Sequence, residues 1–176
     1  MPKAAPTLFT IGHSTRSLEE FLAILKAHGV CVLADVRTIP RSRHVPQFDA
    51  QTLGPDLAQC GMEYVLLPAL GGLRKPSDSS TNLAWHNSRF RAYADYMQTP
   101  AFQQGLKQLM RIASAKSTAI MCAEAVPWRC HRSLIADALI AQGWQVLDLM
   151  SEHAAKPHKL TDFARVSGTH VTYPAE

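Results

Sequence analysis

The sequence predicts an α/β fold in which a mostly parallel five-stranded sheet lies between two layers of helices. Short apolar runs alternate with segments of helical periodicity along residues 1–150, a pattern typical of parallel strands joined by right-handed helical crossovers. The run CVLADV at residues 31–36 is apolar except for Asp35, as expected for a strand covered on both faces. We therefore expect a single-domain, three-layer sandwich of the Rossmann-like or flavodoxin-like kind. Residues 151–176 should form a polar tail that packs on the same domain or extends from it.

The first half of the chain alternates three predicted strands with two predicted helices. The first strand ends in a glycine, and Ser17 with Glu20 then forms the capping box of an amphipathic helix. Gly29 ends this helix, because glycine is favoured just after a helix C-terminus. Pro55 falls inside the second helical pattern, which leaves the start of that helix open. The predicted strands are residues 7–12, 31–36 and 62–67, and the apolar positions of the helices are Leu18, Phe21, Leu22, Leu25, Leu53 and Leu57.

The second half adds a long loop, three predicted helices and two predicted strands. Residues 71–80 are rich in glycine, proline, serine and charge, a composition typical of a loop. Thr99 and Pro100 are the residue types of a helix N-cap and a first helical position. A last helical pattern begins at about Ser133 and ends at Gly143. The predicted helices are residues 89–97, 100–113 and 133–142, and the predicted strands are residues 118–121 and 146–150.

The composition is that of one globular domain in a reducing compartment. Of the 176 residues, 47% are apolar and 18% are charged, values that disfavour disorder. The formal net charge of +4 is too small by itself to indicate nucleic-acid binding. Residues 1–6 lack an apolar signal core and no apolar run approaches membrane-spanning length, so we expect a cytoplasmic protein with no membrane partner. Cys31, Cys60, Cys122 and Cys130 lack disulfide-framework spacing, and we expect free thiols.

Four of the predicted strands end in short loop segments, three of which carry polar side chains. Because the carboxyl ends of parallel strands meet at one edge of the sheet, where α/β proteins bind their ligands, we expect these residues to share one crevice. The segments concerned are residues 12–15, 35–37, 68–72 and 122–124. The loop CAEAVPWRCHR at residues 122–132 carries two thiols, a carboxylate, an imidazole and two guanidiniums, and it is the strongest indication of a functional site.

The side chains expected in this crevice fall into two chemical groups. Carboxylates, thiols and imidazoles act as acids, bases or nucleophiles, whereas arginines suit bidentate recognition of phosphate or carboxylate. The candidate catalytic residues are Asp35, Cys122, Glu124, Cys130 and His131. The candidate anion-binding residues are His13, Ser14, Arg37, Arg41, Ser42 and Arg132. Structural interpretations also stay open: Asp35 with Arg37 as an ion pair, and Ser14 as a helix cap.

Several familiar ligand sites are absent from the sequence. The first strand ends in a single glycine rather than G-x-G-x-x-G, and no Walker-type lysine loop occurs, which argues against an NAD or ATP site. A tyrosine-phosphatase loop needs an arginine six positions after its cysteine, but Trp128 stands there after Cys122 and Ala136 after Cys130. The polar side chains of the 122–132 loop match no zinc-binding spacing. No metal site is predicted, and the sequence leaves the cofactor unknown.

Five short motifs follow one another along most of the chain. They are TIGHST at residues 10–15, ADVRTIPRSR at residues 34–43, Phe48, YVLLPALGG at residues 64–72 and CAE with CHR between residues 122 and 132. Together they resemble the bacterial and archaeal family labelled domain of unknown function 488. The resemblance implies a single cytoplasmic α/β domain with no settled activity. The chain departs from the family at residues 147–150, which read LDLM where relatives often have a histidine.

The leading hypothesis is an enzyme that acts on a phosphorylated, nucleotide or nucleic-acid substrate in a basic crevice. In it, the arginines hold the anion and the carboxylates, thiols or imidazole carry the chemistry. Trp85, Trp128 and Phe48 are candidates for stacking on a base. Two alternatives stay open: a non-catalytic nucleotide- or nucleic-acid-binding module, and a thiol or sulfur-transfer protein that uses Cys122 or Cys130. No oligomeric state is predicted.

Overall fold

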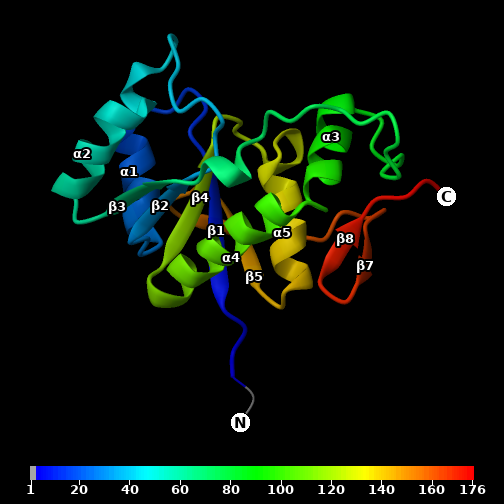
Figure 1. Cartoon of the computed structure of the whole chain (residues 1–176). Coiled ribbons are helices and arrows are strands. Elements are labelled where there is room, and N and C mark those ends of the chain that lie inside the picture. The colour runs from blue at the N-terminus through cyan, green and yellow to red at the C-terminus, as the bar shows by residue number, and fades with distance from the viewer. Residues whose placement is uncertain (1–2) are drawn as a thin grey trace.

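The computed structural model describes residues 3–176 and has the predicted α/β architecture. The strands of its main sheet are β1 (Thr7–Gly12), β2 (Val32–Asp35), β3 (Glu63–Leu66), β4 (Thr118–Cys122), β5 (Gln145–Ser151) and β6 (Ala154–Pro157). Within the described residues these strands form one sheet in the order β3-β2-β4-β1-β5-β6, in which β1 to β5 are parallel (Figure 1). The predicted three-layer sandwich is confirmed. The sheet has six strands rather than five because β6 pairs antiparallel with β5.

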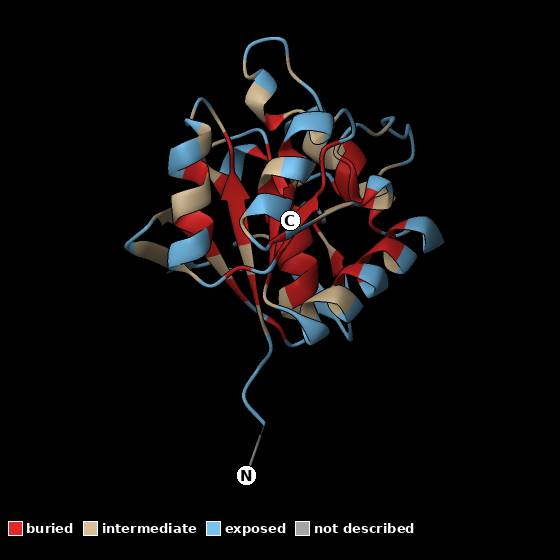
Figure 2. Ribbon diagram, turned by 90° about the vertical axis from the view of Figure 1, so that its left-hand side faces the viewer, coloured by how far each residue is buried: buried red, intermediate tan, exposed pale blue. Residues whose placement is uncertain are grey.

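Helices cover both faces of the sheet. The helices are α1 (Leu18–Ala27), α2 (Ala50–Gln59), α3 (Ser88–Tyr96), α4 (Pro100–Ala115) and α5 (Arg132–Ala141), with 3-10 turns η1 (Pro46–Phe48), η2 (Pro68–Leu70) and η3 (Pro127–Arg129). One core joins α1 and α2 to strand residues such as Ile11 and Met121, and the other joins α3, α4 and α5 to Leu8 and Ile120. Buried residues follow the strands and the inner sides of the helices (Figure 2). No helix of residues 3–176 is long and apolar enough to cross a bilayer.

The helix ends agree with the signals in the sequence. The Ser17 hydroxyl accepts a hydrogen bond from the Glu20 N–H, as the capping box predicts. Thr99 is the N-cap of α4, and Pro100 is its first residue. The helix α5 begins at Arg132, one residue earlier than expected. This difference matters for the site, because Arg132 is thereby fixed in the first turn of a regular helix.

Residues 151–176 form strands in addition to loops. They contribute β6 to the edge of the main sheet. They also form a two-stranded antiparallel hairpin from β7 (Arg165–Ser167) and β8 (His170–Thr172), which lies beside α5 in Figure 1. Sequence periodicity did not indicate these short strands, because each has only three or four residues and most of their side chains are not buried.

A buried polar cluster fastens this last segment to the domain. The Asp137 carboxylate of α5 accepts hydrogen bonds from the hydroxyls of Thr161 (2.6 Å) and Tyr173 (2.7 Å). The His158 ring lies between two carboxylates, with Nε2 3.1 Å from Asp137 and Nδ1 3.5 Å from Asp148. Burial opposes protonation of this ring, but the two carboxylates outweigh it and raise the pKa of His158 to about 9.

Stability should therefore fall as His158 loses its proton. An unfolded histidine has a pKa of about 6.5, so the raised folded value contributes stability that is complete below pH 6.5 and is lost as the pH rises through about 9. We expect the free energy of unfolding to decrease by up to about 3 kcal/mol over this interval. Urea denaturation at a series of pH values measures the change.

His158→Gln should remove most of this pH dependence, whereas His153→Gln, at an exposed position of the same segment, should leave it intact. Equal pH profiles for the two variants would show that the carboxylates do not hold His158 in its charged form.

Candidate functional site

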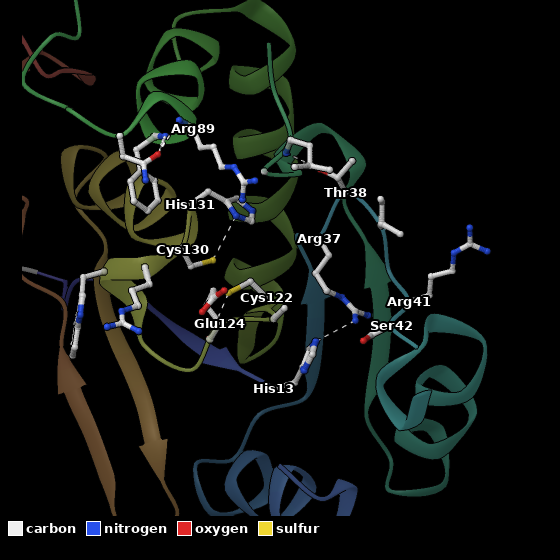
Figure 3. Close-up of a pocket in the computed structure, with 18 residues that line it drawn as sticks. His13, Arg37, Thr38, Arg41, Ser42, Arg89, Cys122, Glu124, Cys130 and His131 are labelled. Atoms are coloured by element: carbon white, nitrogen blue, oxygen red, sulfur yellow. Dashed lines mark hydrogen bonds between the residues drawn. The ribbon is translucent and has the colours of Figure 1, made fainter. Parts of the chain in front are cut away.

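A crevice of about 480 Å³ opens at the carboxyl ends of β1, β2 and β4. The loops after these strands meet there with the loop that follows β3 and the start of α3 (Figure 3). The common crevice predicted from the sequence is thus present. It is lined by His13, Arg37, Thr38, Ile39, Arg41, Ser42, Gly72, Leu73, Asn87, Arg89, Phe90, Cys122, Ala123, Glu124, Trp128, Arg129, Cys130 and His131.

Cys122, the last residue of β4, lies beside a buried arginine. Arg132 is only 1% exposed, and its NH1 group is 3.3 Å from the Cys122 Sγ. The guanidinium also donates to the carbonyl oxygens of Glu124 (3.1 Å) and Ala125 (3.2 Å). Among the described residues it forms no ion pair with a carboxylate, and its buried Nε has no hydrogen-bond partner. Of the hydrogen-bond partners of the guanidinium, the sulfur of Cys122 is therefore the group that can supply a negative charge.

The two thiols of the crevice have opposite pKa shifts. Burial by itself raises the pKa of Cys122, but contact with the Cys130 thiol and the positive charge of Arg132 outweigh it and lower the pKa. Burial raises the pKa of Cys130, and the neighbouring Cys122 raises it further. Of the two, Cys122 is therefore the thiol that loses its proton first.

Cys130 has a neutral imidazole as its neighbour. Its Sγ lies 3.5 Å from the Nδ1 of His131 and accepts the backbone N–H of Arg132 at 3.4 Å. The His131 Nε2 is 2.7 Å from the Val36 carbonyl oxygen, and because a carbonyl only accepts, Nε2 carries the ring proton. Burial lowers the pKa of His131 to about 4, so the bare Nδ1 faces the thiol.

Asp35 is enclosed and supports another residue. It is completely buried, and its carboxylate accepts hydrogen bonds from the Arg37 Nε (2.9 Å) and NH2 (2.7 Å) and from the Tyr64 hydroxyl (2.5 Å). Asp35 does not line the crevice. Its geometry matches the structural ion pair that the sequence also allowed. The Asp35 carboxylate fixes the orientation of the Arg37 guanidinium.

His13 and Arg37 form the wall opposite the thiols (Figure 3). The His13 ring stacks on the buried Phe48 ring, with centroids 4.6 Å apart, and its Nδ1 donates to the Ser14 carbonyl oxygen at 2.9 Å. Burial lowers the pKa of His13, so its unprotonated Nε2 faces the Arg37 NH1 at 3.4 Å. Ser14 itself does not line the crevice. It takes a left-handed backbone conformation, with φ of 46°, and its N–H donates to Ala123.

The rim of the crevice is basic. Arg41, Arg89 and Arg129 line it with exposed side chains and form no ion pair among the described residues. Glu124 supplies the carboxylate among the described lining residues and is also exposed. Ser42 lines the crevice as predicted, and its backbone N–H donates to Asp49. Arg132, by contrast, is buried and is not among the residues that line the crevice.

Apolar side chains are exposed at the same rim. Ile39, Leu73 and Trp128 line the crevice and are 55%, 59% and 68% exposed. Of the three aromatic residues considered for stacking, Trp128 is the exposed one. Phe48 is completely buried, and Trp85 packs among Phe90, Phe163 and Tyr173.

Some lining residues gave no recognisable signal in the sequence. Asn87, Arg89 and Phe90 belong to the start of α3, and the long loop before this helix returns it to the edge of the sheet. Loop composition predicts irregular structure but not where the loop leads. Within the described residues, no three His, Cys, Asp or Glu side chains form a group that could hold a metal ion.

Two glycines let the loops approach the strand ends closely. A methyl group on Gly12, at the end of β1, would overlap the Glu124 carbonyl oxygen and lie 2.7 Å from the Arg132 NH1. A methyl group on Gly72 would lie 2.5 Å from the His131 Nδ1. Both contacts are shorter than real Cβ contacts allow, so the geometry around the thiols requires glycine at these positions.

The comparisons with known proteins give one match. The model of the family described as Domain of unknown function DUF488 matches residues 17–139. This segment extends from the cap of α1 into α5 and includes both thiols, Glu124 and Arg132. Neither a curated protein nor a solved structure matches the chain significantly.

Gly12→Ala should destabilise the protein strongly. The added methyl group displaces the Glu124 carbonyl oxygen and the Arg132 guanidinium, and we expect a loss of about 3 kcal/mol of unfolding free energy, as for severe overpacking. Urea denaturation measures this loss.

Gly54→Ala is the matched control. Gly54 lies inside α2, where the nearest atoms to an added methyl group belong to Tyr64 at 4.0 Å. Alanine should stabilise that helix by about 0.5–1 kcal/mol. If Gly12→Ala is as stable as the wild type, the loop that carries Glu124 is not held at the tip of β1.

Proposed function

The chain belongs to the DUF488 family, whose description names no reaction, and we propose that it is an enzyme that binds a small anionic substrate in the crevice and attacks it with the Cys122 thiolate. The single observation that carries this proposal is the buried Arg132 guanidinium, whose NH1 lies 3.3 Å from the Cys122 Sγ with no carboxylate partner among the described residues.

Burial of an uncompensated positive charge costs several kcal/mol. A neutral thiol at Cys122 leaves that cost in place, whereas a thiolate supplies a charge-assisted partner for Arg132. The thiolate is also the form of cysteine that acts as a nucleophile. Cys122 lines the crevice, so a substrate in it meets the sulfur directly. A cysteine that only packs at the end of a strand does not need a buried arginine beside its sulfur.

The basic rim selects an anionic substrate. Arg41, Arg89 and Arg129 present three charges against the one carboxylate of Glu124, and the charge of Arg37 is already balanced by Asp35. Guanidiniums of this kind bind phosphate or carboxylate through paired N–H groups. An excess of one charge at a crevice also raises the local concentration of ions of the opposite sign.

The remaining residues complete a group-transfer reaction. The Cys122 sulfur forms a bond with an electrophilic centre of the substrate, and the leaving group departs with the bonding electrons. Glu124 relays a proton to the leaving group or from the water that releases the product. His13, which is neutral, and the NH1 group of Arg37 line the opposite wall and orient the substrate.

An anionic alkylating reagent tests both parts of the proposal without knowledge of the substrate. Iodoacetate and the neutral iodoacetamide react with thiolates by the same displacement. We expect the rate with iodoacetate divided by the rate with iodoacetamide to be larger at Cys122 than at Cys31, which is exposed outside the crevice. We also expect the alkylation rate of Cys122 to reach its half-maximum at a lower pH than that of Cys31. Peptide mass spectrometry after timed quenching gives both rates from one sample.

Arg41→Ala, Arg89→Ala and Arg129→Ala should each reduce the Cys122 ratio by about two- to threefold, the size of one exposed charge interaction, and added salt should reduce it further. Arg111→Ala, at an exposed position of α4 outside the crevice, is the matched control and should change nothing. If the alkylation rate of Cys122 has the pH midpoint of an ordinary thiol, Cys122 is not the activated nucleophile. If the ratio of the iodoacetate rate to the iodoacetamide rate is the same at Cys122 as at Cys31, the crevice does not favour an anionic substrate.

A further inference from the structure

We propose that Cys122 and Cys130 form a reversible disulfide when a hydroperoxide enters the crevice, with Cys122 as the attacking thiol and Cys130 as the resolving thiol. This inference rests on the Cys122 thiolate of the proposed function but not on the identity of the substrate. It gives the same crevice a second reaction, with a different co-reactant.

The two thiols occupy one wall of the crevice, where Figure 3 shows their sulfur atoms close together. Both sulfurs contact the same residue. The Arg132 NH1 is 3.3 Å from the Cys122 Sγ, and the Arg132 backbone N–H is 3.4 Å from the Cys130 Sγ. They are eight positions apart in the sequence, and the intervening loop returns the chain to the tip of β4. A disulfide between them therefore closes a loop that is already formed.

The two thiols also differ in pKa, as the attacking and the resolving thiol of an oxidation should. Cys122 has the larger thiolate fraction, because contact with the Cys130 thiol and the positive charge of Arg132 lower its pKa, and Cys130 keeps its proton until the second step. The other two cysteines lack this arrangement. Cys31 is exposed, and its Sγ donates a weak hydrogen bond to the Gly29 carbonyl oxygen, 3.7 Å away. Cys60 is half-buried at the end of α2.

The first step balances with the hydroperoxide as oxidant. The Cys122 thiolate attacks the outer oxygen of the hydroperoxide, so that a sulfur–oxygen bond forms and the oxygen–oxygen bond breaks. The alcohol, or water from hydrogen peroxide, leaves after it takes up one proton from solvent. Sulfur is oxidised by two electrons and the peroxide is reduced by two, which leaves a sulfenic acid at Cys122.

The second step consumes the sulfenic acid. The Cys130 sulfur attacks the Cys122 sulfur, the sulfur–sulfur bond forms, and the sulfur–oxygen bond breaks as hydroxide leaves. The thiol proton of Cys130 passes through the His131 Nδ1, which is unprotonated and 3.5 Å away, and combines with the hydroxide to give water. An external dithiol reverses the reaction by thiol–disulfide exchange.

The oxidised form leaves Arg132 without an anion beside it. The buried guanidinium then keeps only neutral acceptors, the carbonyl oxygens of Glu124 and Ala125. That arrangement disfavours the disulfide relative to the dithiol, so we expect mild dithiols to reduce it. While the disulfide persists, Cys122 cannot attack a substrate.

Peroxide treatment of the intact wild-type protein tests the inference. We expect hydrogen peroxide to remove two hydrogen atoms from the protein mass, and two of the four cysteines to become resistant to alkylation after denaturation. Peptide mapping should show Cys122 linked to Cys130, and dithiothreitol should restore four alkylatable thiols. A double variant, Cys31→Ser with Cys60→Ser, should form the same link, because neither position lines the crevice.

Single variants separate the two roles. Cys130→Ser should retain the sulfenic acid at Cys122, detected as one added oxygen atom that a 1,3-dione captures, whereas Cys122→Ser should not oxidise at Cys130 at the wild-type rate. Four reactive thiols after peroxide treatment, a link that involves Cys31 or Cys60, or a sulfinic acid at Cys122 with Cys130 still free would each overturn the inference. Any of these results combined with a depressed alkylation midpoint at Cys122 would leave the proposed function standing.

Discussion

The interaction on which the site depends is the contact between the buried Arg132 guanidinium and the sulfur of Cys122. Arg132 belongs to the first turn of α5, and Cys122 ends β4, so one side chain bridges the loop between a strand and its following helix. Its other N–H groups hold the carbonyl oxygens of Glu124 and Ala125. The same charge therefore fixes the path of the loop and favours the reactive form of the thiol.

The buried arginines on the two sides of the crevice differ in whether a carboxylate balances their charge. On the β2 side, the carboxylate of Asp35 is saturated by Arg37 and Tyr64, so this pair is electrically neutral and rigid. On the β4 side, Arg132 has no carboxylate among the described residues. An arginine with a carboxylate partner only orients its surroundings, whereas one without such a partner can change the protonation of a neighbouring group.

The fold and the location of the crevice were predictable from sequence because both follow from local rules. Strand–helix alternation specifies a parallel sheet, and a parallel sheet brings the residues after its strands to one edge. The sequence did not reveal which polar groups would be enclosed, because burial depends on packing between distant segments: Asp35 and Arg132 turned inward, whereas Arg41 stayed exposed. Arg89 reaches the site through a long loop, whose path composition does not specify.

The polar cluster around Asp137 lies on the same helix as Arg132, one and a half turns further along. The family match ends at residue 139, yet the partners that satisfy this carboxylate, His158, Thr161 and Tyr173, all come later in the chain. In a relative with a different carboxyl-terminal segment, the side chain at position 137 would be a buried carboxylate without these hydrogen-bond partners. Positions 137 and 158 should therefore vary together among relatives, with the acid retained only where the histidine accompanies it.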